Sequence, residues 1–286
     1  MGSSVKRIET RQTAARAQRK IAVVGCGKMG TILLRAFFDR GLVSATEATA
    51  TVQHEERCNV VSGELDGVAV TTDNRAAVGK APVVLLCVKP QALPQVLEEI
   101  APEIAPGTLV ISIAASTTTS FIQQKLAKNV AVVRAMPNTP AMVGAAMTAI
   151  CAGQGAGAEH IETARALFES VGRVAIVDEK HMDAITALSA SGPAFVFVIL
   201  ESLAEAGVKV GLPREMATTL AAQTLFGSAK LALETGHHPA LLKDAVTTPA
   251  GCTIEGLMEL ERGGLRVTLM NAIVKTTKRA RELMGE

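Results

Sequence analysis

The sequence predicts an α/β protein, with a doubly wound, mostly parallel sheet in its N-terminal part and an all-helical C-terminal part. Short runs rich in β-branched residues alternate with helical stretches from Lys20 to Val177. Strands that alternate with helices are typical of a parallel sheet covered on both faces. After Asp178 the strand signal stops and long apolar helical patterns follow. A glycine-rich turn directly after the first run is the third observation, because such turns follow the first strand of many doubly wound folds.

The expected strands lie at residues 20–24, 48–52, 68–71, 83–88, 109–113, 130–133 and 174–177. Local signals place helices between most of these strands. Gly41 ends the first helix, Asp73 caps a short one, and the threonines at 117–119 cap a helix that runs through Lys128.

The C-terminal part begins with one long helix, expected at residues 180–209 with a kink at Gly192-Pro193. Further helical stretches are expected from Pro213 to Gly236, after Pro239, and from a threonine-rich turn at 246–253 to Glu286. These helices hold more apolar surface than a unit of about 100 residues can bury alone. We therefore expect them to pair two chains in a homodimer.

Composition excludes several classes of function. A net charge of +2 does not favour nucleic acid or a membrane surface, and seven Phe without Trp or Tyr offer no stacking platform for bases. Five cysteines without a Cys-x-x-Cys pair argue against disulfides and against a metal site. The apolar run at 184–200 is interrupted by polar residues and is shorter than the ~20 residues of a bilayer span. We expect a cytoplasmic protein with a small-molecule substrate.

Residues 25–30, GCGKMG, form a G-x-G-x-x-G motif between an expected strand and an expected helix. The first glycine permits a tight turn, the second lets the backbone approach a pyrophosphate, and the third lets the helix pack closely on the strand. The helix start adds N–H groups and a positive dipole. We assign the whole loop to a dinucleotide in a Rossmann-type domain, namely Gly25, Cys26, Gly27, Lys28, Met29 and Gly30.

The end of the second strand favours NADPH as the cofactor, with NADH as the alternative. An NAD site usually has an acid there, about 20 residues after the glycines, to hold the ribose 2′-OH. This chain instead reads TVQH at 51–54, with Arg57 close by. Thr51, Gln53, His54 and Arg57 can bind a 2′-phosphate.

Three parts of the chain follow from these signals. We expect a basic, disordered tail at 1–19, a dinucleotide-binding domain at 20–178, and a helical dimerisation and substrate domain at 179–286. Glu9 is the sole acid of the tail, a composition that also fits a transit peptide.

The remaining side chains favour hydride transfer without a strong general acid. There is no Tyr, no Lys lies between His181 and Val208, and the His237-His238 pair lies in an expected turn. Reduction of a protonated carbon–nitrogen double bond suits this set, since it needs orientation and one hydrogen-bond partner. Thr253 can supply that hydroxyl, while Thr248 and the N–H groups of 250–252 can hold a carboxylate. Capping of the helix is the structural alternative for these threonines.

Five separated segments resemble the motifs of a known family. They are CVKP at 87–90, MPNTP at 136–140, SASGPAF at 189–195, HPALLKD at 238–244 and VTTPAGCTIEGLMELE at 246–261. The family is pyrroline-5-carboxylate reductase, the last enzyme of proline biosynthesis, and the resemblance spans residues 20–286. It implies NAD(P)H-dependent reduction of 1-pyrroline-5-carboxylate to L-proline. It also implies homodimers, which in the family often assemble into decamers.

The resemblance implies roles for single residues. Asn74 lies where the family binds the adenosine half of the cofactor. Val88 and Lys89, to which we add Pro90, approach the nicotinamide ribose, and Ala115 approaches the nicotinamide. On the substrate side, Thr253 corresponds to the hydroxyl at the ring nitrogen and Thr248 and Gly251 to carboxylate binders, to which we add Cys252 and Ser191.

The chain departs from the family at Ser116 and Ala250, where members often have glycine. Ala250 matters if its backbone needs a positive φ, which is costly for alanine. Two other functions stay open at this point. One is a reductase of another cyclic imine or a β-hydroxyacid dehydrogenase, and the other is a cofactor-binding sensor without catalysis.

Overall fold

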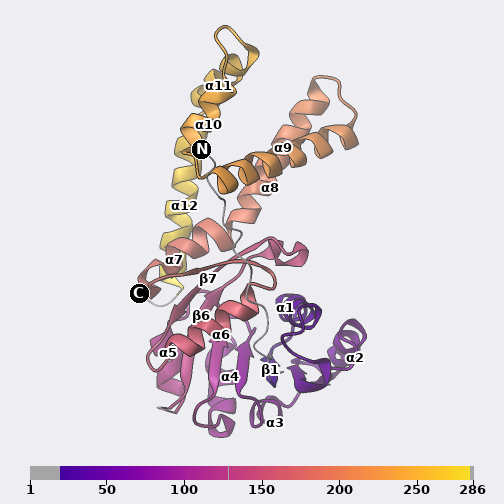
Figure 1. Ribbon diagram of the computed structural model, residues 1–286, viewed down its shortest axis with the longest axis vertical. Coiled ribbons are helices and arrows are strands. Elements are labelled where there is room, and N and C mark those ends of the chain that lie inside the picture. Colours follow the sequence, from indigo (N-terminus) through magenta and orange to yellow (C-terminus); the bar gives the residue numbers. More distant parts are fainter. Residues whose placement is uncertain (1–19, 128, 284–286) are drawn as a thin grey trace, which may run out of the picture. The chain divides into compact units, whose positions relative to one another are not determined.

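A computed structural model describes residues 20–127 and 129–283 (Figure 1). The tail expected at 1–19 and the expected helix ends at Lys128 and Glu286 lie outside the described residues. The described chain divides into two compact units. One comprises residues 20–135 and 141–176, and the other comprises residues 136–140 and 177–283.

The first unit is built on an eight-stranded sheet with the order β3-β2-β1-β4-β5-β6-β7-β8. Its strands are β1 (Ile21–Val24), β2 (Ala48–Thr51), β3 (Ala69–Thr71), β4 (Val83–Leu86), β5 (Leu109–Ser112), β6 (Ala131–Met136), β7 (Ala146–Ala152) and β8 (Gly172–Ile176). The pairings from β3 through to β6 and the β7–β8 pairing are parallel. The predicted doubly wound, mostly parallel sheet is confirmed. Strand β7 was missed, because its sequence AMTAICA is rich in alanine and poor in β-branched residues.

Helices cover both faces of this sheet. They are α1 (Lys28–Asp39), α2 (Glu55–Glu64), α3 (Asn74–Val78), α4 (Leu93–Ile100), α5 (Thr119–Lys125) and α6 (Ala158–Phe168). Ile21 and Val23 of β1 belong to one core cluster, together with Phe37 of α1 and Phe168 of α6. The alternate residues of β1 belong to a second cluster that includes Leu97 of α4. Alternate side chains of a strand point to opposite faces, so the strands in the middle of the sheet are buried on both faces.

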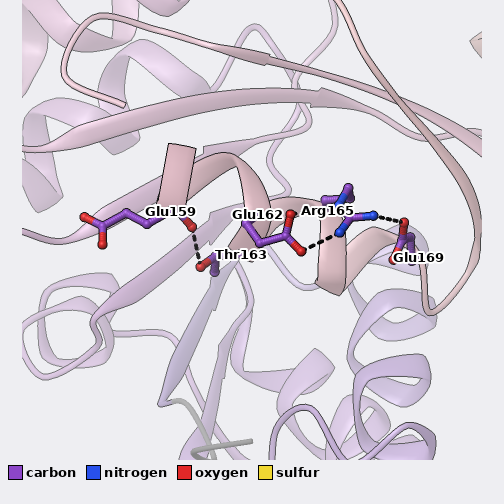
Figure 2. Close-up of polar contacts among 5 residues, drawn as sticks. All are labelled: Glu159, Glu162, Thr163, Arg165 and Glu169. Atoms are coloured by element: carbon purple, nitrogen blue, oxygen red, sulfur yellow. Dashed lines mark hydrogen bonds and ion pairs between the residues drawn. The ribbon is translucent and has the colours of Figure 1, made fainter. Parts of the chain in front are cut away.

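The outward side of α6 is charged (Figure 2). Arg165 donates to both carboxylate oxygens of Glu162, at 2.5 and 2.9 Å, and to Glu169 at 2.9 Å. The hydrogen bond from Arg165 lowers the pKa of the Glu162 carboxyl. Exposed pairs of this kind add little stability. They keep one side of α6 in water while Leu167 and Phe168 enter the core.

The second unit is helical, as predicted. It holds η4 (Glu179–His181), α7 (Met182–Ile185), a π-helical turn η5 (Thr186–Ala190), α8 (Gly192–Lys209), α9 (Arg214–Thr235), α10 (Pro239–Ala245), α11 (Cys252–Arg262) and α12 (Leu265–Glu282). The helix predicted over 180–209 with a kink at Gly192-Pro193 corresponds to one helical stretch, Glu179–Lys209, which is interrupted at Ser191 by the π-helical turn. The Ser191 N–H bonds to the Thr186 carbonyl at 2.9 Å, a wide turn placed just before Pro193. The final stretch is likewise two helices, because Gly264 takes a φ of +66°.

Helices α8 and α9 pack against each other as a helical hairpin (Figure 1). Their buried side chains are small, chiefly Ala204, Ala217 and Ala221, whereas Phe197 and Phe226 are 61% and 60% exposed. Among the described residues, one helical stretch, Glu179–Lys209, is long and apolar enough to cross a membrane by length and composition. The apolar run expected at 184–200 is shorter than this helical stretch. An apolar helix that pairs with a second chain meets the same criterion.

Candidate active site

The predicted cofactor residues lie at the carboxyl ends of neighbouring strands. Gly25 follows β1, Gln53 follows β2, Val88 follows β4 and Ala115 follows β5. Strand β1 pairs with β2 on one side and with β4 on the other, so the strand order reverses at β1. In open parallel sheets, ligands bind at the carboxyl ends of the strands beside such a reversal. The topology therefore gathers at one edge residues that lie far apart in the sequence.

The glycines of the loop meet three different demands. Gly25 has a φ of +77°, and a Cβ atom there would lie 2.4 Å from Cγ1 of Val88. At Gly30, a Cβ atom would lie 3.2 Å from Cγ1 of Val23, so this glycine allows α1 to approach the sheet. A Cβ at Gly27 would have no described atom within 4 Å. The first and third glycines thus serve the protein's own packing, and the second leaves an open face.

Cys26 shapes the loop rather than facing outward. Its N–H donates to the Thr51 carbonyl at 2.6 Å, and its buried thiol lies 3.7 Å from the Thr31 hydroxyl. Burial raises the pKa of this thiol. The N–H groups that remain for an anion are those of the first turn of α1, from Lys28 to Gly30, and that turn contains no acidic residue.

A cavity of about 270 Å³ opens at the same edge. Four predicted residues besides Gly25 line it, namely Thr51, Gln53, Asn74 and Val88. Glu99 of α4 also lines it, and sequence reasoning missed this residue because nothing in the local sequence links α4 to the end of β2. Thr51 was expected to face a phosphate. Thr51 is instead fully buried. Its hydroxyl accepts a hydrogen bond from the Gly25 N–H and donates one to the Asn74 side chain.

The other predicted residues after β2 are exposed, and Arg57 is the cation among them. Gln53, His54 and Arg57 lie at the surface, with His54 at the start of α2. Arg57 and Lys28 line a neighbouring groove of about 710 Å³ along α1. No ion pair involves either cation among residues 20–127 and 129–283.

Two further segments border this edge. Val88 and Pro90 are partly buried just after β4, while Lys89 between them is exposed. Ala115 is partly buried after β5. Ser116, which follows it, has a φ of +54°, the conformation that glycine adopts without strain.

The threonine-rich turn of the second unit has a defined geometry. The Gly251 N–H donates to the Thr248 carbonyl at 3.1 Å, which closes a turn with Pro249 second and Ala250 third. Ala250 has a φ of +55°. This pattern fits a type II turn, whose third residue requires a positive φ. Ala250 therefore has the positive φ that is costly for alanine.

The hydroxyls around this turn have different surroundings. Thr247 donates to the Lys243 carbonyl at 2.8 Å and so bonds back to α10 instead of capping α11. A Cβ at Gly251 would lie 2.4 Å from Oγ1 of Thr248, so this hydroxyl folds over the glycine. Thr253 is the second residue of α11, partly exposed, and its hydroxyl has no hydrogen-bond partner in the described part of the chain. Cys252 is exposed beside it.

Ser191 lies in a different place from the threonine-rich turn. It lines a cavity of about 450 Å³ together with Thr139, Phe195 and Thr276. Thr253 is not among the residues that line this cavity. The described residues also contain no cluster of His, Cys, Asp and Glu that could hold a metal ion.

Comparison with known proteins decides the family. A model described as pyrroline-5-carboxylate reductase dimerisation matches residues 179–283, and one described as NADP oxidoreductase, coenzyme F420-dependent, matches residues 20–116. The chain is 42% identical to the pyrroline-5-carboxylate reductase of Methanosarcina acetivorans, over 93% of this chain and 98% of the relative. It is 40% identical to that of Arabidopsis thaliana, over 92% and 95%. The chain belongs to the pyrroline-5-carboxylate reductase family.

Solved structures agree with this assignment. A pyrroline-5-carboxylate reductase from Coxiella burnetii matches with a TM-score of 0.85 and 35% identity, over 93% of this chain and 98% of that one. The Plasmodium falciparum pyrroline carboxylate reductase, solved with NADP bound, matches with a TM-score of 0.84 and 27% identity over the same shares. The predicted family, fold and activity are confirmed: this is an NADP-linked pyrroline-5-carboxylate reductase of proline biosynthesis. Its helical unit is a dimerisation domain.

Proposed function

We propose that this pyrroline-5-carboxylate reductase prefers NADPH to NADH and binds it along the carboxyl edge of the sheet. The N–H groups at the start of α1 hold the pyrophosphate, and Asn74 holds the adenosine half. Val88, Lys89 and Pro90 border the nicotinamide ribose, and Ala115 borders the nicotinamide. Exposed Gln53, His54 and Arg57 in place of an acid support binding of the 2′-phosphate.

Cofactor preference is tested by replacing the cation after β2. Arg57→Ala should weaken NADPH binding about tenfold and leave NADH binding unchanged, since only NADPH has the 2′-phosphate. Arg40→Ala is the matched control, because Arg40 lies at the far end of α1. Equal losses for the two cofactors would contradict the proposed role of Arg57.

The substrate binds at the threonine-rich turn in this proposal. Thr248, Gly251 and the N–H groups at the start of α11, including that of Cys252, hold the carboxylate. The Thr253 hydroxyl accepts from the protonated ring nitrogen, and Ser191 makes a further contact. The single observation that supports this most directly is the Thr253 hydroxyl, which has no hydrogen-bond partner among the described residues and lies in the first turn of α11.

The reaction needs no strong general acid from the side chains. NADPH, when bound, supplies the hydride that adds to the imine carbon. As the new C–H bond forms, the electron pair of the C=N bond moves onto the nitrogen, which already bears its proton. The Thr253 hydroxyl accepts a hydrogen bond from this N–H and so orients the ring, a role that a neutral hydroxyl can fill while the charge at nitrogen changes.

Replacement of Thr253 tests the assignment. Thr253→Val should lower kcat by about a hundredfold, the loss typical of one transition-state hydrogen bond, and leave the Kd of NADPH unchanged. Thr253→Ser should restore most of the activity. Thr247→Val is the control, because that hydroxyl already bonds to the Lys243 carbonyl. If Thr253→Val lost cofactor binding and thermal stability together with turnover, Thr253 would be a structural residue.

We also propose domain limits of 20–178 and 179–286, a basic tail at 1–19, a cytoplasmic location and homodimers that assemble into decamers. The compact units, which part at residues 176 and 177, support the domain limits. Light scattering after size exclusion tests the assembly, with a mass of ten 29.7 kDa chains expected. A particle of two chains at all concentrations would reject the decamer, and cell fractionation tests the location.

A further inference from the structure

A chain of three hydrogen bonds runs through the wall of the cofactor cavity. The Gly25 N–H donates to Oγ1 of Thr51 at 3.1 Å. The Thr51 hydroxyl donates to Oδ1 of Asn74 at 2.6 Å, and Nδ2 of Asn74 donates to Oε2 of Glu99 at 3.0 Å. These three hydrogen bonds join four places that are separate in the sequence: the glycine loop, the end of β2, the start of α3, and α4.

The donor and acceptor roles in this chain depend on the carboxylate at its end. An ionised Glu99 can only accept a hydrogen bond, so it fixes the Asn74 amide with Nδ2 toward α4 and Oδ1 toward Thr51. Oδ1 then takes the single hydroxyl proton of Thr51, which leaves the oxygen of Thr51 to accept from Gly25. A rotated Asn74 amide would set Oδ1 of Asn74 against the Glu99 carboxylate, two acceptors with no proton between them.

The position and burial of these hydrogen bonds relate them to the ligand and not only to packing. All four residues line the cavity of about 270 Å³ at the carboxyl edge of the sheet. Thr51 is fully buried, so its hydroxyl has no water to exchange with. Glu99 is partly buried, and the Nε of Arg75 donates to its main-chain carbonyl at 3.0 Å, which holds this end of α4 against α3.

We propose that Glu99 is a positioning residue for the cofactor. It acts through Asn74 and Thr51, fixing the direction of the Asn74 amide and of the glycine loop before NADPH arrives. The inference rests on the proposed function, in which Asn74 and the loop bind the cofactor. Because Glu99 orders residues that meet the part common to both cofactors, its contribution applies equally to NADPH and NADH. This distinguishes Glu99 from Arg57, which contacts only the extra phosphate.

The test compares cofactor affinities of full-length variants by isothermal titration calorimetry. Glu99→Ala should raise the Kd of NADPH and of NADH alike by about tenfold, as expected when a charge-assisted hydrogen bond no longer holds its partner. Both kcat at saturating NADPH and the KM for pyrroline-5-carboxylate should stay unchanged. Glu99→Gln should recover most of the affinity, because its amide oxygen can still accept from Asn74. Glu98→Ala is the control, since Glu98 on the same helix pairs with Lys125 and does not line the cavity.

The double variant separates the possible failures. If Asn74→Ala weakens binding and adding Glu99→Ala costs nothing more, the two residues act as one unit, as proposed. If Asn74→Ala weakens binding but Glu99→Ala does not, the positioning role is wrong and the cofactor site stands. If neither variant changes the Kd of NADPH, both the inference and the proposed role of Asn74 are wrong. A lower melting temperature for Glu99→Ala with an unchanged Kd would assign Glu99 to stability alone.

Discussion

The two units of this chain bury their apolar residues in different ways. In the α/β unit, the middle strands are buried on both faces, and Phe37 and Phe168 are fully enclosed. In the helical unit, most large apolar side chains of the described residues are exposed, including Phe197, Phe226 and Leu233. One unit therefore completes its core within a single chain, whereas the other needs a second chain to cover it. Stability of the helical unit should accordingly depend on protein concentration.

The largest effect is expected from a charge on the exposed apolar helices. Phe226→Asp should weaken dimerisation at least a hundredfold, because the interface would bury an unpaired carboxylate. The matched control is Val60→Asp on α2, whose side chain is also exposed but belongs to the α/β unit. Sedimentation velocity over a dilution series measures both. A dimer that survives Phe226→Asp would place the interface on another surface.

Next in size is the difference between two glycines of one loop. Gly25→Ala should lower both the melting temperature and NADPH affinity, since it combines a φ of +77° with a 2.4 Å approach to Val88. Gly27→Ala should keep the melting temperature and lose at least tenfold in affinity, because its Cβ would project only toward the ligand. Thermal melts and NADPH titrations distinguish these outcomes. Unchanged NADPH affinity in Gly27→Ala would show that the pyrophosphate does not bind at this loop.

Cysteine reactivity should also differ between the units. Burial raises the pKa of Cys26, so at neutral pH less of it is thiolate than of an ordinary cysteine, and the side chain is enclosed as well. Cys252 is exposed beside the threonine-rich turn. Iodoacetamide should therefore label Cys252 well before Cys26, with loss of turnover, and Cys252→Ser should resist the inactivation. Peptide mapping by mass spectrometry follows the labelling, and faster labelling of Cys26 would contradict the described loop.

The smallest effect concerns the strained residue of the turn. Ala250→Gly should stabilise the protein by about 0.5–1 kcal/mol, because glycine adopts a φ of +55° without the cost that alanine meets. Gly236→Ala is the converse control, at a φ of +65° with no atom near its Cβ, and should destabilise by a similar amount. Differential scanning calorimetry at one protein concentration measures both. Destabilisation by Ala250→Gly would show that the turn is not strained.

Most of the fold could be predicted from local sequence, and the failures have physical causes. The strand positions follow from β-branched runs, but β7 is built largely from alanine and gives no such signal. The π-helical turn at 186–190 depends on how Pro193 and the following helix fit together, which composition does not specify. The glycine loop and Thr253 could be proposed from the sequence because their chemistry is local. Glu99 was missed because only the sheet order brings α4 beside β2 and α3.

The central claim is that this chain reduces pyrroline-5-carboxylate with NADPH. The direct measurement is a steady-state assay of the full-length protein with pyrroline-5-carboxylate and each nicotinamide cofactor in turn, with proline quantified in parallel. We predict that NADPH is oxidised mole for mole with proline formed, at a higher kcat/KM than NADH. Absence of turnover with both cofactors, or oxidation of NADPH without proline, would contradict the account.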